Sequence, residues 1–397
     1  MKDLKLPLMS NNISRDDVDC LIEFLQQEPI PRLTNGPKVI EFEKAWSEWL
    51  GVKHSVFVNS GTAANELTML ALKHLFPEGG DIIIPPLAWV SDVNSVLFSG
   101  FKPVFSDINL KNLSFDLDKL EKTLYDNWDS HYTRAIFVTH VLGLNALSDR
   151  LLKMCIDNDV LLIEDVCESH GATYNNIKLG SIGFASNFSF YFAHHMSTIE
   201  GGMVSTNDDH FYQLCKSLRS HGMVREFNDE KLIEKYTNDY PDLNQDFVFI
   251  GPAHNFRSTE INAVLGLCQL EKLDSNNQIR IDNFEYFIEN LDSEKYYTDF
   301  EMDGQCNYAF IVIMKDDDFD LRDKIEKMMK ENGIEFRRGL SGGGNQMRQP
   351  YFKNHDINFD EFPNIDHVHN FSWYIGNYPS LDMDKIKGLI TLLNNQE

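Results

Sequence analysis

Residues 55–84 read SVFVNSGTAANELTMLALKHLFPEGGDIII, and this stretch decides the fold class. An apolar run, Ser55–Val58, is followed by a helical pattern over Ala63–Leu75 and by a second apolar run, Asp81–Ile84. Both runs are short, rich in Val, Ile and Phe, and bounded by Asn, Gly and Pro, which is typical of strands. A strand, a helix and a strand in this order predict one unit of a parallel sheet.

The same alternation continues to about residue 210. Further strands are expected at Pro103–Phe105, Ala135–Thr139, Val160–Ile163, Phe188–Tyr191 and Met203–Ser205. Helical segments such as Leu147–Asn158 lie between several of them. The predicted fold class is therefore α/β, with a mostly parallel central sheet that is covered by helices on both faces.

The pattern changes in the last third of the chain. Residues 259–291 predict one long helix, with a break expected near residues 275–277. A strand at Ala309–Met314 and a helix over about residues 320–332 indicate a smaller α+β domain. We expect an N-terminal segment with the large domain over 1–250, a connecting helix over 251–291 and the small domain over 292–397. Residues 338–362 lack a clear period, and such long segments in compact proteins are often functional.

Composition narrows the function classes. The 397 residues carry 61 acidic and 36 basic side chains, for a formal net charge of −25. Nucleic acid and anionic membrane would both be repelled, whereas a local cluster of Arg could still bind an anionic small molecule. We expect no signal peptide, because the first residues lack an apolar region, and no membrane-spanning helix, because no apolar run approaches 18 residues. The cysteines lack zinc spacing, so we expect reduced thiols in a cytoplasmic protein and no metal site. They are Cys20, Cys155, Cys167, Cys215, Cys268 and Cys306.

Two candidate ligand sites follow the first two strands. Small residues over 59–65 would expose backbone N–H groups at the positive end of a helix dipole, which favours an anion such as phosphate. The alternative is an ordinary strand-to-helix turn with a Thr cap. The turn matches neither the P-loop nor GxGxxG, which disfavours ATP and dinucleotides. Trp89 follows the strand Asp81–Ile84 and could stack on a planar ring, or simply pack as a half-buried side chain.

Acidic and histidine side chains follow two later strands. Asp165 ends an apolar run, and Glu168 comes three residues later. An Asp at a strand tip can hold a protonated ring nitrogen, although capping of a helix is the alternative. His194 and His195 follow another β-rich run, and in extended chain only one of them would enter a given site. That histidine could shuttle protons near neutral pH, the alternative being a loop with one solvated His.

Arginine-containing segments stand at 251–260, GPAHNFRSTE, and at 336–350, FRRGLSGGGNQMRQP. Clustered Arg beside flexible Gly suits a dianion such as a nucleotide diphosphate, and surface charge beside a turn is the alternative. The candidate substrate-binding residues are Arg257, Arg337, Arg338, Asn345 and Arg348.

In their order and spacing, these motifs resemble the DegT/StrS-type family of pyridoxal-phosphate (PLP) sugar-nucleotide enzymes, within the fold-type I aminotransferase superfamily. The resemblance covers about residues 6–394. It rests on NSGTAAN at 59–65, IEDVCESHGA at 163–172, SFYFAHHMSTIEGGMV at 189–204 and NFRSTEINAVLGLCQLEKLD at 255–274.

The resemblance implies a role for each motif. Residues implied to bind the cofactor phosphate are Ser60, Gly61, Thr62, Ala63 and Ser189. Trp89 would stack on the pyridine ring, Asp165 would pair with the ring nitrogen, and Glu168 would lie near the ring hydroxyl. Asn255 would reach the phosphate of the neighbouring subunit, so a homodimer with shared active sites is expected.

One departure from the family concerns the reaction. Most members carry a Lys six residues before the Glu of the EGG motif, where this chain has His194. Imidazole cannot form a Schiff base, so the cofactor is expected to bind without a covalent link. A His at this position is similar to the 3-dehydratases of the family. The surrounding motifs resemble those of the 3-dehydratases that act on GDP-linked 4-keto-6-deoxymannose. CDP-linked relatives use an iron–sulfur cluster, but after Cys215 only Cys268 and Cys306 remain, too few for its four ligands.

The resemblance therefore implies a sugar-nucleotide 3-dehydratase that uses PLP and pyridoxamine phosphate (PMP). It would take an amino group from L-glutamate, remove the carbon-3 hydroxyl of a nucleotide-linked 4-keto-6-deoxy hexose or heptose, and release ammonia. The product would serve deoxysugar biosynthesis for surface polysaccharide such as lipopolysaccharide O-antigen. His194 would remove a proton from the cofactor's methylene carbon. Asp165 would keep the nitrogen of the cofactor ring protonated, so that the ring can act as an electron sink. The alternatives are an aminotransferase of the same fold and a catalytically silent relative that binds sugar nucleotide.

Overall fold

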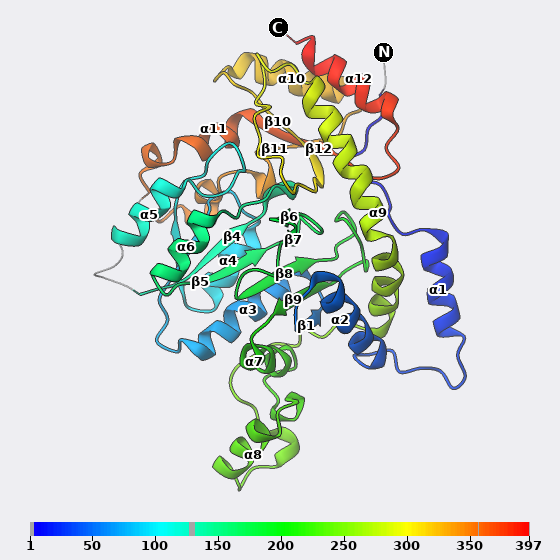
Figure 1. The fold of residues 1–397 in the computed structure, drawn as a ribbon, viewed down its shortest axis with the longest axis vertical. Helices are drawn as coiled ribbons and strands as arrows, with labels where there is room; N and C mark the ends of the chain where they lie inside the picture. Colours follow the sequence, from blue (N-terminus) through cyan, green and yellow to red (C-terminus); the bar gives the residue numbers. More distant parts are fainter. Residues whose placement is uncertain (1–3, 127–131, 356, 397) are drawn as a thin grey trace.

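The computed structural model describes residues 4–126, 132–355 and 357–396. Its main feature is a seven-stranded sheet in the order β1-β9-β8-β5-β4-β2-β3 (Figure 1). The strands are β1 (His54–Val58), β2 (Asp81–Ile84), β3 (Lys102–Phe105), β4 (Thr133–Thr139), β5 (Leu161–Asp165), β8 (Ala185–Ser189) and β9 (Gly202–Thr206). Strand β9 is antiparallel to both of its neighbours, and the other neighbouring strands pair in parallel. The predicted α/β class with a mostly parallel sheet is confirmed.

Successive side chains of β1 enter two different apolar cores. Val56 and Val58 pack with residues of helices α3 and α7 on one face of the sheet. Phe57 packs on the other face, with residues of helices α2, α6 and α9. A strand that is buried on both faces needs apolar side chains at nearly every position. This requirement explains why continuous short apolar runs located most of the strands.

Helices cover both faces of this sheet (Figure 1). Those of the first 250 residues are α1 (Arg15–Leu25), α2 (Pro37–Leu50), α3 (Gly61–Leu75), α4 (Val90–Phe98), α5 (Leu117–Asp126), α6 (Asp149–Asp157), α7 (Asp209–Arg219) and α8 (Glu230–Asp239). A small hairpin consists of β6 (Thr173–Tyr174) and β7 (Ile177–Lys178). In the part of the chain that is described, no helix has the length and apolar character needed to cross a membrane.

The C-terminal part forms a second, smaller body. Its antiparallel sheet has the order β10 (Ala309–Ile313), β12 (Ser372–Gly376), β11 (Phe336–Arg338). Its helices are α10 (Phe319–Glu331), α11 (Pro363–Phe371) and α12 (Met383–Asn394). Leu6 pairs with Ile334 and is fully buried in the core of this body. The N-terminal segment therefore packs on the small body, and the expected division into 1–250, 251–291 and 292–397 stays a prediction.

Helix α9 (Glu260–Asn290) is continuous over 31 residues and runs alongside both bodies (Figure 1). Thr259 caps its N-terminus by accepting a hydrogen bond from the N–H of Asn262. The break expected near residues 275–277 is wrong. Asn277, which suggested it, is buried and donates a hydrogen bond of 2.9 Å to the carbonyl of His170. Its polarity serves a tertiary contact and does not interrupt the helix.

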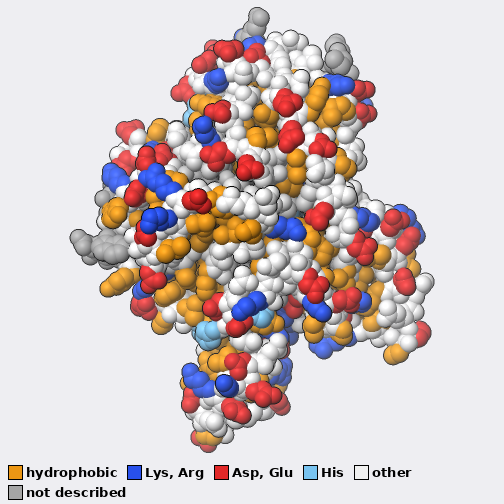
Figure 2. Space-filling view, viewed as in Figure 1, with side chains coloured by type: hydrophobic (Ala, Val, Ile, Leu, Met, Phe, Trp, Pro, Cys, Tyr) orange, Lys and Arg blue, Asp and Glu red, His pale blue; other side chains and the backbone are white. Residues whose placement is uncertain are grey.

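Helix α8 projects from the large body and buries none of its own side chains (Figure 1). Acidic and basic side chains are intermixed over the projection and over the rest of the face that Figure 2 shows. The net negative charge is therefore spread out on this face and is not gathered in one acidic region.

Candidate active site

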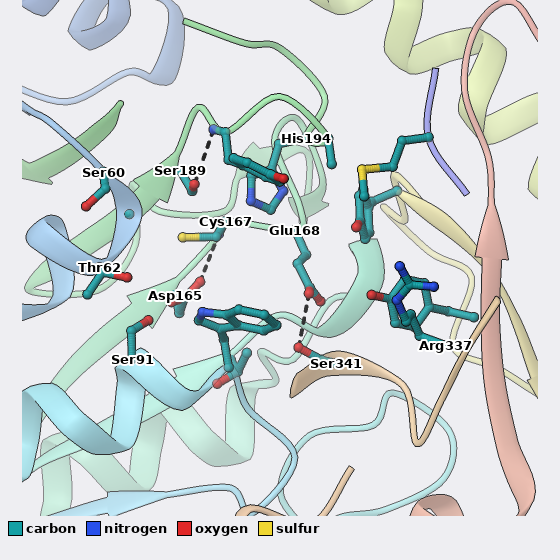
Figure 3. A pocket seen from close by; sticks show the side chains of 18 of the residues that line it. Ser60, Thr62, Ser91, Asp165, Cys167, Glu168, Ser189, His194, Arg337 and Ser341 are labelled. Atoms are coloured by element: carbon teal, nitrogen blue, oxygen red, sulfur yellow. Dashed lines mark hydrogen bonds between the residues drawn. The ribbon is translucent and has the colours of Figure 1, made fainter. Parts of the chain in front are cut away.

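A cavity of about 390 Å³ lies where the strands of the large sheet end (Figure 3). Ser60 follows β1 and Trp89 follows β2, while Thr139, Asp165 and Ser189 are the last residues of β4, β5 and β8. These strands run in the same direction, so their carboxyl ends meet at one edge, where open α/β sheets bind ligands. The cavity is lined by Leu8, Met9, Ser60, Gly61, Thr62, Trp89, Ser91, Thr139, Asp165, Cys167, Glu168, Ser189, Tyr191, Ala193, His194, Glu200, Tyr308, Arg337, Ser341 and Tyr374.

The N-terminus of α3 forms one wall of the cavity. The Ser60 hydroxyl accepts a hydrogen bond of 3.0 Å from the N–H of Ala63, which itself does not line the cavity. The N–H groups of Gly61 and Thr62 belong to the first helical turn and have no partner within the helix. A Cβ on Gly61 would lie only 2.6 Å from the Cβ of Ser189, so glycine is required for this approach. Helix dipole, N–H groups and hydroxyls together make a suitable anion site.

Asp165 presents a negative charge to the cavity although it is only 4% exposed. Its Oδ1 accepts a hydrogen bond of 2.9 Å from the N–H of Cys167 (Figure 3), and its Oδ2 accepts one of 3.1 Å from the Asn65 amide. Among the described residues no Lys, Arg or His forms an ion pair with it. A cationic group of a ligand could therefore bind there. Trp89 is 52% exposed and lines the same cavity, which suits a planar ligand.

Glu168 connects the large sheet to the segment 338–362. Its Oε1 accepts a hydrogen bond of 3.0 Å from the Ser341 hydroxyl (Figure 3), and its Oε2 accepts one of 3.0 Å from the N–H of Leu142. Burial, assisted by the charge of Asp165, raises the pKa of Glu168 to about 7. Near neutral pH a fraction of Glu168 is protonated and can donate a hydrogen bond, as a Gln would.

His194 lies on a turn that begins just after β8. Its N–H donates a hydrogen bond of 3.0 Å to the carbonyl of Tyr191, so β8 ends at Ser189 and the expected extension to Tyr191 is wrong. Burial and the positive charge of Arg280 lower the pKa of His194 to about 4. The ring is therefore neutral at neutral pH and able to accept a proton.

His195 does not line the cavity. Its Nε2 donates a hydrogen bond of 2.9 Å to the carbonyl of Cys306, and its ring stacks on that of His170 with 5.3 Å between the centroids. The expectation that one histidine of the pair enters the cavity is confirmed. The reason given for it was wrong, because the backbone around the pair is a turn and not an extended strand.

Of the arginines predicted to bind substrate, Arg337 lines the cavity. Arg338, the next residue of β11, points to the other face of its sheet and pairs with Glu326 on α10 at 3.5 Å. Arg257 donates a hydrogen bond of 3.1 Å to the Oδ1 of Asn255, and both side chains lie outside the cavity. These residues would have to meet a ligand that extends beyond the cavity, or one held by a second subunit.

Asn345 and Arg348 are both engaged by Asp366. The Asn345 amide donates to its Oδ1 at 2.9 Å, and the Arg348 guanidinium binds both carboxylate oxygens. Asn345 is completely buried and neither residue lines the cavity. Their visible role is to fix the segment that carries Ser341.

Several cavity residues carry no motif that sequence reasoning could use. Leu8 and Met9 come from the N-terminal segment, and Tyr374 lies on β12, a strand that the sequence did not predict. Tyr308 precedes β10 and its ring centroid lies 5.6 Å from that of His194. Within the described ranges, no group of three or more His, Cys, Asp or Glu side chains is arranged to hold a metal ion.

Comparison with known families matches residues 13–394 to the model of the DegT/DnrJ/EryC1/StrS aminotransferase family. The chain belongs to this family. It is 29% identical, over 98% of both chains, to the GDP-4-keto-6-deoxy-D-mannose 3-dehydratase of Yersinia pseudotuberculosis. It is 27% identical to the Escherichia coli enzyme of that name solved with bound hydrated PLP, covering 98% of this chain and 100% of that one, with a TM-score of 0.86. A structure of GDP-4-keto-6-deoxymannose-3-dehydratase with a trapped PLP-glutamate geminal diamine has the same identity and coverage and a TM-score of 0.84.

As a member of the DegT/DnrJ/EryC1/StrS family, the chain has the fold-type I architecture expected from its motifs. Within the described part of the chain, the cavity is lined by His194 and by no lysine. The departure noticed in the sequence is therefore located in the cavity itself, which Asp165 and the α3 turn also line.

Proposed function

We propose that this member of the DegT/DnrJ/EryC1/StrS family is a PLP- and PMP-dependent 3-dehydratase of a nucleotide-linked 4-keto-6-deoxy sugar. The GDP-linked hexose is favoured because the similar enzymes are GDP-4-keto-6-deoxymannose 3-dehydratases, and L-glutamate because one of them holds a PLP-glutamate adduct. The observation that carries the proposal is that His194, and no lysine of the described residues, lines the cavity. Such a site favours a proton transfer by imidazole and offers no amine for a covalent link to the cofactor.

The cavity fits the proposed cofactor. The α3 turn, which a Cβ on Gly61 would block, suits the phosphate, together with the hydroxyls of Ser60 and Ser189. The exposed face of Trp89 suits the ring, and the unpaired carboxylate of Asp165 suits a protonated ring nitrogen. When bound, PLP or PMP would supply a conjugated ring that withdraws electrons from the attached substrate.

The protein's own side chains supply the charge, the proton transfer and the hydrogen bonds that the reaction needs. Asp165 holds a proton on the ring nitrogen by charge, because a carboxylate favours the protonated partner. The neutral imidazole of His194 accepts a proton from carbon and can return it to the departing hydroxyl. Glu168, partly protonated near pH 7, donates a hydrogen bond at the cavity wall formed with Ser341.

An aminotransferase is the second candidate, since the family carries that name. It would release an amino sugar, whereas the dehydratase releases ammonia and a 3-deoxy keto sugar. A silent sugar-nucleotide-binding relative would release neither. The buried carboxylate of Asp165 argues against the silent relative, because binding sugar alone does not require it.

The deciding experiment is product analysis with GDP-, CDP- and dTDP-linked 4-keto-6-deoxy sugars, PLP and L-glutamate. Ammonia and a 3,6-dideoxy keto sugar support the dehydratase, an amino sugar supports the aminotransferase, and no product with tight binding supports the silent relative. Dialysis in the absence of ligand should remove the PLP absorbance, because the link is not covalent.

We further propose a homodimer in which Asn255, exposed in the single chain, completes the neighbouring active site. Analytical ultracentrifugation should give a dimer, and Asn255→Ala should weaken PLP binding without altering the dimer. A monomer with full turnover would contradict this. The six unpaired cysteines and the sugar-nucleotide substrate favour a cytoplasmic enzyme of surface-polysaccharide synthesis.

A further inference from the structure

Asp92, in the first turn of α4, is completely buried behind Asp165. Its Oδ1 accepts a hydrogen bond of 2.8 Å from the side-chain amide of Asn65, and its Oδ2 accepts one of 2.9 Å from the Thr139 hydroxyl. The same Asn65 nitrogen donates to Oδ2 of Asp165 at 3.1 Å. One amide group therefore binds two carboxyl groups that also lie within hydrogen-bonding distance of each other.

Two carboxylates in contact and away from water repel each other strongly. The titratable groups that face Asp92 are Asp165, Glu168, Cys167 and Tyr351. None of them is a base that could supply a positive charge. Burial and the charge of Asp165 together raise the pKa of Asp92 well above its usual value.

The proton is expected on Asp92 and the charge on Asp165. Asp165 borders the cavity and also accepts the N–H of Cys167, which stabilises its ionised form. Asp92 is fully enclosed and has no such main-chain donor among the hydrogen bonds of the described residues.

We propose that Asp92 is a positioning residue that stays protonated at neutral pH and donates a hydrogen bond to Asp165. This bond holds the Asp165 carboxylate ionised and aimed into the cavity. The proposal concerns the protein itself. It rests on the proposed function only for its effect on turnover.

The test compares two substitutions of Asp92 that differ in hydrogen bonding. Asp92→Asn keeps the shape and an N–H donor without charge, so it should retain turnover within about threefold. Asp92→Leu removes the hydrogen-bond donor to Asp165, so the acid limb of kcat/KM should move up by about one pH unit. If Asp92 were ionised, both variants would relieve repulsion and the acid limb would move down.

A measurement on the cofactor-free protein keeps this test independent of catalysis. Isotope-edited infrared spectroscopy at pH 7 should detect the C=O stretch of a protonated aspartic acid, and this band should vanish in Asp92→Asn. Asp107→Asn is the matched control, because Asp107 is also buried but forms an ion pair with Lys119 at 2.7 Å. The Asp107→Asn substitution should leave the C=O band of the protonated aspartic acid unchanged.

A wild-type spectrum without that band, or a band that survives in Asp92→Asn, would overturn the proposal even if Asp92→Leu fails to fold. A protein that shows the band but releases no ammonia would contradict the proposed function and leave the role of Asp92 standing.

Discussion

The side-chain amide of Asn12 donates a hydrogen bond of 3.0 Å to the main-chain carbonyl of His194. The carbonyl of Asn12 in turn accepts a bond of 2.9 Å from Gln269 on α9. The Ser14–Asp17 capping box that starts α1 follows directly. The N-terminal segment thus ties the turn that carries His194 to the long helix.

Replacing Asn12 tests this tie. Asn12→Ala should lower kcat about fivefold, because a hydrogen bond worth about 1 kcal/mol no longer fixes the turn. PLP affinity should stay unchanged, since the α3 turn is not touched. Asn11→Ala is the control, because Asn11 is exposed and its side chain accepts a local hydrogen bond from the N–H of Ile13. Equal losses in both variants would argue against a specific role for Asn12.

His194 is the proposed acid–base group. His194→Asn should lower dehydration by about 10²–10⁴-fold, the usual contribution of a positioned acid–base group. It should still bind PLP. His194→Lys should form a covalent bond with PLP, because a desolvated lysine amine is reactive, and borohydride reduction with mass mapping should label that lysine.

His195→Asn is the comparison for these variants. It loses the contact with Cys306 and should lower the melting temperature more than the turnover of the folded enzyme. If the His195 variant were inactive and the His194 variant active, the proton transfer would have been assigned to the wrong histidine.

Asp165→Asn should keep the fold and lose turnover. The amide cannot stabilise a protonated ring nitrogen, so a fall of about 10²–10³-fold is expected, as for other losses of one charge-stabilising group. Ammonia release and circular dichroism, measured in parallel, separate the two effects. Wild-type turnover in this variant would remove Asp165 from the mechanism.

The raised pKa of Glu168 predicts that the stability of the folded protein depends on pH. Burial raises the pKa of Glu168 from the ordinary value of 4.5 to about 7 in the fold, so the native state binds the extra proton between these pH values. Its contribution is complete below about pH 4.5 and is lost as the pH rises through 7. Glu168→Gln should therefore raise the melting temperature relative to wild type by an amount that grows up to about pH 7 and then levels off. A constant difference from pH 5 to 8, by differential scanning fluorimetry, would contradict the raised pKa.

Local sequence patterns predicted the elements whose burial is uniform. The strand Asp81–Ile84 has its predicted bounds, since all four side chains are buried. By contrast, β12 escaped notice because its apolar run is only Trp373–Ile375, between Ser372 and Gly376, although it is the central strand of the small sheet.

Candidate site residues at strand ends were predictable, because a polar residue after an apolar run is visible in the sequence. Asp165 and His194 belong to this group. Leu8, Tyr374 and Asp92 do not, since their roles depend on which distant segments meet. Asn345 and Arg348 were predicted to bind substrate for the same reason. Their partner Asp366 lies 18 or more residues away in the sequence, so the pairing could not be seen there.

The cavity draws its walls from Leu8 at one end of the chain and Tyr374 near the other. During synthesis, almost the whole polypeptide must leave the ribosome before a complete pocket exists, so early fragments should not capture cofactor. Closing contacts of such long sequence separation is slow, which lengthens the time that partly folded chains are open to aggregation. Ligand added during expression or refolding should therefore raise the yield, because it stabilises only the finished molecule.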